Sequence, residues 1–229
     1  MTNHRTTPHD LVLSSGFLAM ARHCGVLKAI EDNEVSIRAL CGTSSGALVG
    51  ALWLSGMSAT EIAAFLTRDR PLHGMAISLR PWRGLFHLGP LISELREVLP
   101  ATFAALPKPF AAGVADHKTN AHLLTQGDLP SAVAASCAMP YLFQRVTQGE
   151  TRWADGGAAD RIMIGPWRTL TGTHPTIIHH VDRSAGVDTE LPPDALLIRS
   201  PRSRAAFWSW RDFEVQMDES YAIATELLQ

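Results

Sequence analysis

The sequence has little charge and no cluster of positive charge. Charged residues make up 18% of its 229 residues, and the formal net charge is −2. Lys and Arg are scattered singly or near one another and form no basic run. Because affinity for a phosphate backbone depends on clustered cations, we expect no nucleic-acid partner.

Cysteine is also scarce, and no long apolar run is present. Cys24, Cys41 and Cys137 lack the spacing of metal ligands, so we expect reduced core thiols, no metal and no cofactor. The first ten residues are polar and lack the apolar region of a secretory signal. The most apolar stretch, residues 46–57, is too short to cross a bilayer. These absences predict a soluble, cytoplasmic protein.

The remaining composition, with 46% hydrophobic residues, is typical of a globular chain. We expect a short polar tail over residues 1–10 and one α/β domain over residues 11–229 that ends in an amphipathic helix. Alternating patterns predict a mostly parallel sheet covered on both faces. The expected strands are 11–13, 35–41, 110–115, 176–181 and 195–198, and the expected helices are 22–31, 45–54, 59–67, 91–99 and 129–137.

Two further segments have distinct patterns. Residues 68–90 alternate Pro and Gly with apolar residues and arginines, which predicts irregular chain. This segment is either a solvated loop or a lid that contacts a lipid surface. From Trp210 to Leu228, apolar residues recur at steps of three and four. That spacing predicts a terminal helix docked on a partner surface, which is either its own core or another chain.

The pentapeptide from Gly42 to Gly46 has the G-x-S-x-G pattern, with Ser44 at its centre. It follows a predicted strand and precedes a predicted helix. Glycines at both ends tolerate a sharp turn that presents the serine hydroxyl above the N-terminus of the following helix. A serine hydroxyl is a weak nucleophile and needs an adjacent base and donors for an oxyanion. We therefore expect Ser44 to be a nucleophile.

The sequence offers two kinds of base for this serine. One is a histidine oriented by an acid, which would be Asp155 or Asp160 followed by His174, His179 or His180. The other is a carboxylate that accepts the serine proton directly. We favour the second, with Asp155 in the run Asp155-Gly156-Gly157, because too few strands precede Ser44 for the α/β-hydrolase arrangement.

Taken together, these segments resemble the patatin-like phospholipase family. The resemblance rests on three separated stretches, which are Leu11–Ser14 with His23–Ile30, Gly42–Ala47, and Ala134–Pro140 leading to Asp155–Gly157. It implies a three-layer α/β/α sandwich with a mostly parallel central sheet. It also implies a Ser-Asp dyad, Ser44 and Asp155, that cleaves lipid or small acyl esters through an acyl-serine intermediate. Transient contact with a membrane surface is a further expectation.

The loop after the first strand departs from the family pattern, which usually has a G-x-G-x-x-G sequence that forms the oxyanion hole. Here the corresponding positions are Ser15, Phe17 and Met20, with Gly16 beside them. We expect the N–H groups of Gly16, Phe17 and Ser45 to hold the oxyanion. Loss of one good donor costs about 10²–10³ in rate, so a catalytically weakened or inactive protein that binds a lipid or a protein partner is the alternative.

Three apolar residues of that loop, Phe17, Leu18 and Met20, either line an acyl pocket or are ordinary buried residues. His23 lies near the same loop in sequence. Its two interpretations are a supporting role behind the site and a structural histidine.

Overall fold

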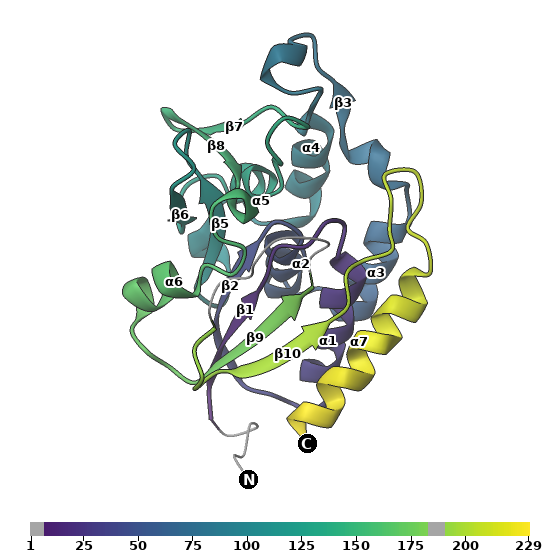
Figure 1. Cartoon of the computed structure of the whole chain (residues 1–229), viewed down its shortest axis with the longest axis vertical. Coiled ribbons are helices and arrows are strands. Elements are labelled where there is room, and N and C mark those ends of the chain that lie inside the picture. The colour runs from purple at the N-terminus through teal and green to yellow at the C-terminus, as the bar shows by residue number, and fades with distance from the viewer. Residues whose placement is uncertain (1–6, 183–190) are drawn as a thin grey trace.

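The computed structural model describes residues 7–182 and 191–229. Their core is an eight-stranded sheet in the order β10-β9-β1-β2-β5-β8-β7, with β6 paired to β5 (Figure 1). Its strands are β1 (His9–Leu13), β2 (Ile37–Thr43), β5 (Phe110–Ala115), β6 (Ala121–Leu124), β7 (Val146–Gln148), β8 (Thr151–Asp155), β9 (Thr176–Val181) and β10 (Leu196–Ser200).

The five strands from β10 to β5 run parallel, whereas β6, β7 and β8 join antiparallel. The edge strand β10 is buried only at Ile198 and Ser200. The other four parallel strands are buried along almost all of their length, and β1 is buried at all five positions. Continuous burial fits their apolar sequences, because strands of a parallel sheet are covered on both faces. The expected α/β fold with a mostly parallel central sheet is confirmed.

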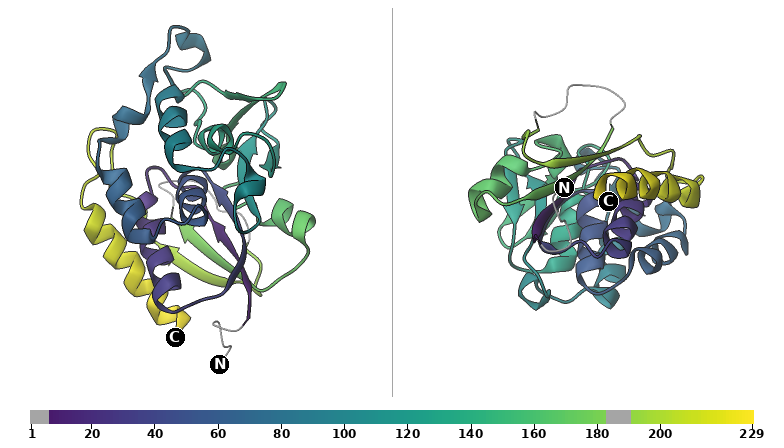
Figure 2. Two further views of the ribbon diagram at one scale, coloured as in Figure 1. Left: turned by 180° about the vertical axis from the view of Figure 1, so that it is seen from behind. Right: turned by 90° about the horizontal axis from the view of Figure 1, so that it is seen from below.

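Alternate residues of β1 separate the two apolar layers. Leu11 and Leu13 belong to the large core beneath α1, α2, α3 and α7. Val12 points to the opposite face and packs with Ile178 and with Trp167 of α6. Figure 2 shows α1, α3 and α7 gathered on one side of the sheet and α6 on the other. The sheet is therefore the middle of three layers.

The helices are close to the lengths that the sequence pattern predicts, except α6, which was not predicted. Good N-caps fix two of them: Ser58 and Glu61 form a capping box at α3, and Asp128 caps α5. The helices are α1 (Met20–Asp32), α2 (Ser45–Leu54), α3 (Ala59–Thr67), α4 (Gly89–Val98), α5 (Leu129–Ser136), α6 (Ile164–Thr171) and α7 (Phe213–Leu228).

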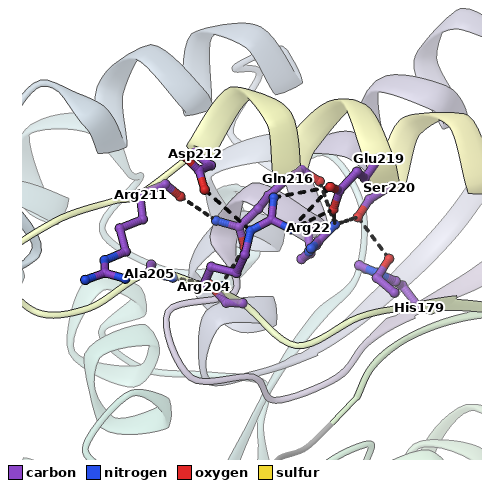
Figure 3. Close-up of polar contacts among 11 residues, drawn as sticks. Arg22, His179, Arg204, Ala205, Arg211, Asp212, Gln216, Glu219 and Ser220 are labelled. Atoms are coloured by element: carbon purple, nitrogen blue, oxygen red, sulfur yellow. Dashed lines mark hydrogen bonds and ion pairs between the residues drawn. The ribbon is translucent and has the colours of Figure 1, made fainter.

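The terminal helix α7 docks on its own chain, along α1. Buried Arg22 of α1 donates through Nη1 to the Gln216 carbonyl at 3.1 Å and pairs with Glu219 at 2.6 Å (Figure 3). Arg204 reaches the same Glu219 carboxylate at 3.2 Å. These two arginines hold the pKa of Glu219 below its usual value. The ion pair between buried Arg22 and Glu219 therefore adds to the apolar contact of α7, which the spacing of its apolar residues predicts.

Several element boundaries differ from prediction. Strand β1 begins at His9, inside the expected 1–10 tail, because Asp10 is buried and its carboxylate bonds to Arg38 and Trp167. Residues 68–90 contain short elements within otherwise irregular chain: β3 (Ala76–Ile77) pairs with β4 (Phe86–His87). Among the described residues, no helix is long and apolar enough to cross a membrane.

Candidate active site

Strand pairing brings Ser44 and Asp155 together. Strand β2 pairs with β5 as far as Thr43 opposite Gly113, and Ser44 follows at once. Strand β8 arrives antiparallel and ends with Asp155 opposite Val114. The two ends therefore meet at adjacent residues of β5, although they are far apart in sequence. The Ser44 side chain lies close enough to the Asp155 carboxyl at this junction to lower the pKa of that carboxyl.

The backbone of Ser44 is strained. Its φ of 54° and ψ of −121° lie outside the regions that non-glycine residues normally adopt, and such strain concentrates at functional turns. Close packing holds the turn in place, since a side chain on Gly46 would collide with the Leu13 carbonyl and one on Gly42 with the backbone of Ala47. The local geometry is that of a sharp strand-to-helix turn that exposes a serine hydroxyl.

Ser136 and Cys137, which lie far from the motif in sequence, hold the backbone of the Ser44 turn. Ser136 Oγ accepts a hydrogen bond from the Ser44 N–H at 2.8 Å and donates to the Gly113 carbonyl at 2.6 Å. Cys137 Sγ lies 3.4 Å from the Ser44 carbonyl. A single buried hydroxyl thus ties the serine turn to β5. The resemblance singled out residues 134–140, but nothing local in the sequence indicated this role for Ser136.

The Asp155 carboxyl is 6% exposed and has a raised pKa. Burial is the largest cause, and it moves the pKa from 3.8 to about 6, against the hydrogen bonds from Ser44 and the Gly157 N–H. The latter bond is 2.7 Å long. A carboxylate that ionises near this pH is a stronger base than an exposed one, yet it is still largely ionised at neutral pH.

The two glycines that follow Asp155 allow a close turn. A side chain on Gly156 would collide with the Gly113 carbonyl, and one on Gly157 with the Ser15 side chain. Both glycines belong to the 3₁₀ turn Gly156–Ala158 that begins at Asp155. The Asp155-Gly156-Gly157 run is therefore a turn, but one whose carboxylate faces the serine.

The loop between β1 and α1 lies at the same site. Gly16, Phe17 and Ser45 line the pocket that contains Ser44. Within the described part of the chain, their N–H groups donate to no protein acceptor. The positive φ of this loop falls on Leu18, at 48°. Phe17 avoids that strain, and its ring packs edge-on against Phe207 at 5.0 Å.

Arg161 fixes the loop between β1 and α1 to the sheet. Its carbonyl accepts from the Ser15 N–H at 2.7 Å, and its guanidinium donates to the carbonyls of Ser15 and Val181 at 2.8 and 2.7 Å. The loop thus keeps a defined conformation without the family's glycines. Arg161 carries no motif, and sequence reasoning gave no indication of this contact.

Ser44 opens onto a pocket with mostly apolar walls. Phe17, Leu18 and Met20, for which the sequence left open pocket lining or ordinary burial, all line this pocket. Arg70, His73 and Glu94 supply charged or polar groups. The apolar side chains from the rest of the chain are Leu48, Phe65, Leu66, Met75, Leu88, Leu91, Met139, Phe143, Phe207 and Trp210.

The histidines lie elsewhere. His23 Nε2 is 3.3 Å from Ser45 Oγ, and its Nδ1 is 2.8 Å from His179 Nδ1. His179 Nε2 in turn lies 2.9 Å from Ser200 Oγ. Burial lowers the pKa of His23 to about 3 and that of His179 well below its usual value, so both are neutral. His23 supports the residue next to Ser44 and does not contact Ser44 itself.

The other residues of the histidine alternative are also not assembled around the serine. His174 Nε2 bonds to the Thr171 carbonyl at 3.0 Å, and Asp160 accepts from the Ile162 N–H at 2.9 Å. His180 is buried, with Nδ1 3.9 Å from Asp182. Within the part of the chain that the structure describes, no histidine bonds to Ser44.

The sequence profile of the patatin-like phospholipases matches residues 11–166. The chain belongs to this family. An uncharacterised NTE family protein of Mycobacterium tuberculosis is 27% identical over 160 residues, which is 68% of this chain and 44% of that protein. Another from the same organism is 29% identical over 158 residues, 66% of this chain and 27% of that protein. The chain therefore spans less than half the length of these relatives.

Solved structures share the family fold. VipD from Legionella pneumophila superposes with a TM-score of 0.58 at 11% identity, over 99% of this chain and 67% of that chain. ExoU in its complex with SpcU, from the type III secretion system of Pseudomonas aeruginosa, superposes with a TM-score of 0.52 at 16% identity. The match covers 98% of this chain and 52% of that chain. At such identities the likeness shows the fold alone. Family membership supports a lipid-hydrolase type of function.

Proposed function

We propose that the chain is a serine acyl hydrolase that cleaves lipid or small acyl esters with Ser44 as nucleophile and Asp155 as base. The observation that carries this proposal is the position of the strained Ser44 beside a buried carboxyl, Asp155, at adjacent strand ends; burial raises the pKa of that carboxyl to about 6. The apolar pocket beside them suits an acyl chain. Family membership points the same way.

In the proposed first step, Asp155 accepts the Ser44 proton as Oγ attacks the ester carbonyl. The N–H groups of Gly16, Phe17 and Ser45, which have no acceptor among the described residues, would receive the oxyanion. When the tetrahedral intermediate collapses, protonated Asp155 returns the proton to the leaving alcohol, and the acyl group stays on Ser44. Asp155 then takes a proton from water as the water oxygen attacks the acyl carbonyl, and it returns that proton to Ser44 Oγ when the acid leaves.

Turnover of a soluble p-nitrophenyl ester tests this function. Ser44→Ala removes the nucleophile, so we expect turnover to fall to the level without enzyme. Ser45→Ala is the matched control, because it removes the adjacent hydroxyl, which bonds to His23, and keeps the Ser45 N–H. Turnover that persists in Ser44→Ala, or is lost only in Ser45→Ala, would reject the proposal.

A second function has one observation in its favour. Phe17 stands where the family usually has glycine, and its ring packs on Phe207 beside the pocket. That ring narrows the approach of an ester to the N–H groups, which would suit a protein that binds a lipid without cleaving it. Absence of turnover with every soluble ester tried, together with retained binding of a fatty acid, would favour this alternative.

Activity should rise with pH, because the proposed base must be ionised to accept a proton. Only ionised Asp155 can accept the serine proton, and burial raises its pKa to about 6. We therefore expect kcat/KM for a soluble ester to rise about tenfold per pH unit below about 6 and to level off above it. If kcat/KM of the wild-type enzyme stayed constant down to about pH 4.5, the assignment of Asp155 as the base would be contradicted.

A further inference from the structure

A short arm, residues 76–87, stands out from the body of the protein. It consists of β3, a 3₁₀ turn at Pro81–Arg83 and β4. Figures 1 and 2 show it at one end of the molecule, beyond α4. At its base the Phe86 N–H donates to the Leu142 carbonyl and the Phe86 carbonyl accepts from Gln144, at 2.9 and 2.8 Å. The arm is thus attached to the fold by backbone bonds on both sides of Phe143.

The arm presents large apolar side chains to solvent. Leu79 is 95% exposed, Ile77 and Trp82 are each 78% exposed, and Leu85 is 53% exposed. The other large apolar side chains that are exposed lie mostly apart from one another, such as Leu170 on α6. Single exposed apolar residues are ordinary, but four within nine residues mark an interaction site.

The charged residues among the apolar side chains of the arm are all positive. Arg80 and Arg83 alternate with them and are exposed. Neither forms an ion pair within the described residues, whereas Arg68, before the arm, pairs with Glu94 at 2.6 Å. No Asp or Glu occurs between residues 70 and 93. The arm therefore combines apolar side chains with uncompensated positive charge.

The two ends of the arm line the pocket that holds Ser44. Arg70 and the segment His73–Met75 precede the arm on the pocket wall, and Leu88 and Leu91 follow it. The arm is therefore continuous at both ends with the wall of that pocket. Lipid bilayers with anionic headgroups match this pattern, because tryptophan favours the headgroup region, arginine pairs with phosphate, and leucine and isoleucine enter the acyl region.

We propose that the arm docks the protein on an anionic lipid surface, with Leu79 and Trp82 inserted among the lipids and Arg80 and Arg83 paired with headgroup phosphates. Docking places the pocket mouth against the surface. A lipid can then pass into the apolar pocket without crossing water. The delivery of substrate rests on the proposed hydrolase function, whereas the docking itself does not.

Co-sedimentation with lipid vesicles tests the docking without catalysis, if it is done with Ser44→Ala. We expect binding to phosphatidylcholine vesicles that contain phosphatidylglycerol and much weaker binding to phosphatidylcholine alone. Leu79→Asp with Trp82→Asp should weaken partition by roughly tenfold or more, since two large side chains no longer enter the lipid. Arg80→Gln with Arg83→Gln should weaken binding to the anionic vesicles by roughly tenfold and leave the weak binding to neutral vesicles as it was.

Matched controls carry the same chemical changes outside the arm. Leu170→Asp places a charge at an apolar site that is 56% exposed on α6, and Lys118→Gln with Arg152→Gln removes two exposed positive charges. Both should bind vesicles as the parent does. Thermal unfolding checks that the arm variants remain folded, which we expect because the replaced side chains are exposed.

Three results would overturn the docking proposal: equal binding by arm and control variants, equal binding to neutral and anionic vesicles, or self-association through the arm with no vesicle binding. The last would make the arm an interface between copies of the chain. If wild type hydrolyses no soluble ester but its vesicle binding depends on the arm, the proposed function fails and the docking proposal stands.

Discussion

Asp155→Asn is expected to lower turnover of a soluble ester by about 10²–10⁴ and, at the same time, to stabilise the folded protein. The loss of rate follows because an amide cannot accept the Ser44 proton. Asn keeps an oxygen for the Gly157 N–H, whose bond to Asp155 is 2.7 Å long. The turn should therefore survive the substitution.

The gain in stability follows from the raised pKa. Between 3.8 and about 6, the folded state binds a proton at Asp155 that the unfolded state has lost, so the free energy of unfolding decreases as pH rises through this window. Two pKa units or so correspond to about 3 kcal/mol. A neutral Asn avoids this cost, so the variant should be more stable by up to about 3 kcal/mol near pH 7.5, and the gain should vanish below about pH 4.

Denaturant unfolding of the wild type and the variant at both pH values measures this gain. Asp160→Asn is the control, because it makes the same chemical change five residues away and keeps the oxygen that accepts from the Ile162 N–H. It should retain turnover and show no comparable stabilisation. An Asp155→Asn protein that keeps its activity, or that is less stable at neutral pH, would show that Asp155 is not the buried base proposed here.

Stability is also expected to fall steeply in acid, through His23 and His179. Both are buried, and burial lowers their pKa values, that of His23 to about 3. The unfolded chain binds protons at these histidines below about 6.5 while the folded chain does not, so stability is full above that pH and decreases as pH falls. At about pH 5, His23 alone should cost about 2 kcal/mol.

The Asp155→Asn background suits this measurement, because the carboxyl of Asp155 titrates with the opposite effect on stability. Unfolding free energies at about pH 7.5 and about pH 5 should differ clearly in that background. Adding His23→Gln should reduce the difference, whereas adding His117→Gln, a change at an exposed histidine, should not. Equal stability at the two pH values would contradict the assignment of neutral, buried histidines.

Much of the fold follows from local patterns. The expected helix over residues 45–54 and the strands over 110–115 and 176–181 match α2, β5 and β9 residue for residue. These segments have strong local signals: small and apolar residues after a turn motif in α2, a short uncharged run in β5 and β-branched residues in β9. The family resemblance rests mostly on other stretches, such as Gly42–Ala47 and Ala134–Pro140, and is confirmed by the profile match.

The strand that carries Asp155 could not be predicted in this way. Strand β8 is partly exposed and pairs with Val114 and Ala115, some forty residues earlier in the chain. Local sequence shows only a turn at Asp155-Gly156-Gly157. The hypothesis that Asp155 pairs with Ser44 came from the small number of strands before Ser44 and from the resemblance. Local periodicity gave no support, because contacts between distant segments leave none.

The supporting contacts were also beyond local reasoning. Ser136 and Arg161 act through backbone groups of distant residues, Ser44 and Ser15 respectively. The arm lies within residues 68–90, which were predicted as irregular chain that is either a solvated loop or a lid that contacts a lipid surface. The exposure of Leu79 and Trp82, on which the docking proposal rests, depends on how the segment leaves the fold.

Mass spectrometry of the trapped covalent intermediate tests the central claim most directly. The enzyme is incubated with a p-nitrophenyl ester or a fluorophosphonate, quenched in acid and digested, and the modified residue is located within the Ser44–Ser45 peptide. We expect the adduct on Ser44, with a much slower rate of labelling in Asp155→Asn and nearly the wild-type rate in His23→Gln. An adduct on Ser45 or on a histidine, or labelling that depends on His23 and not on Asp155, would contradict a Ser-Asp dyad.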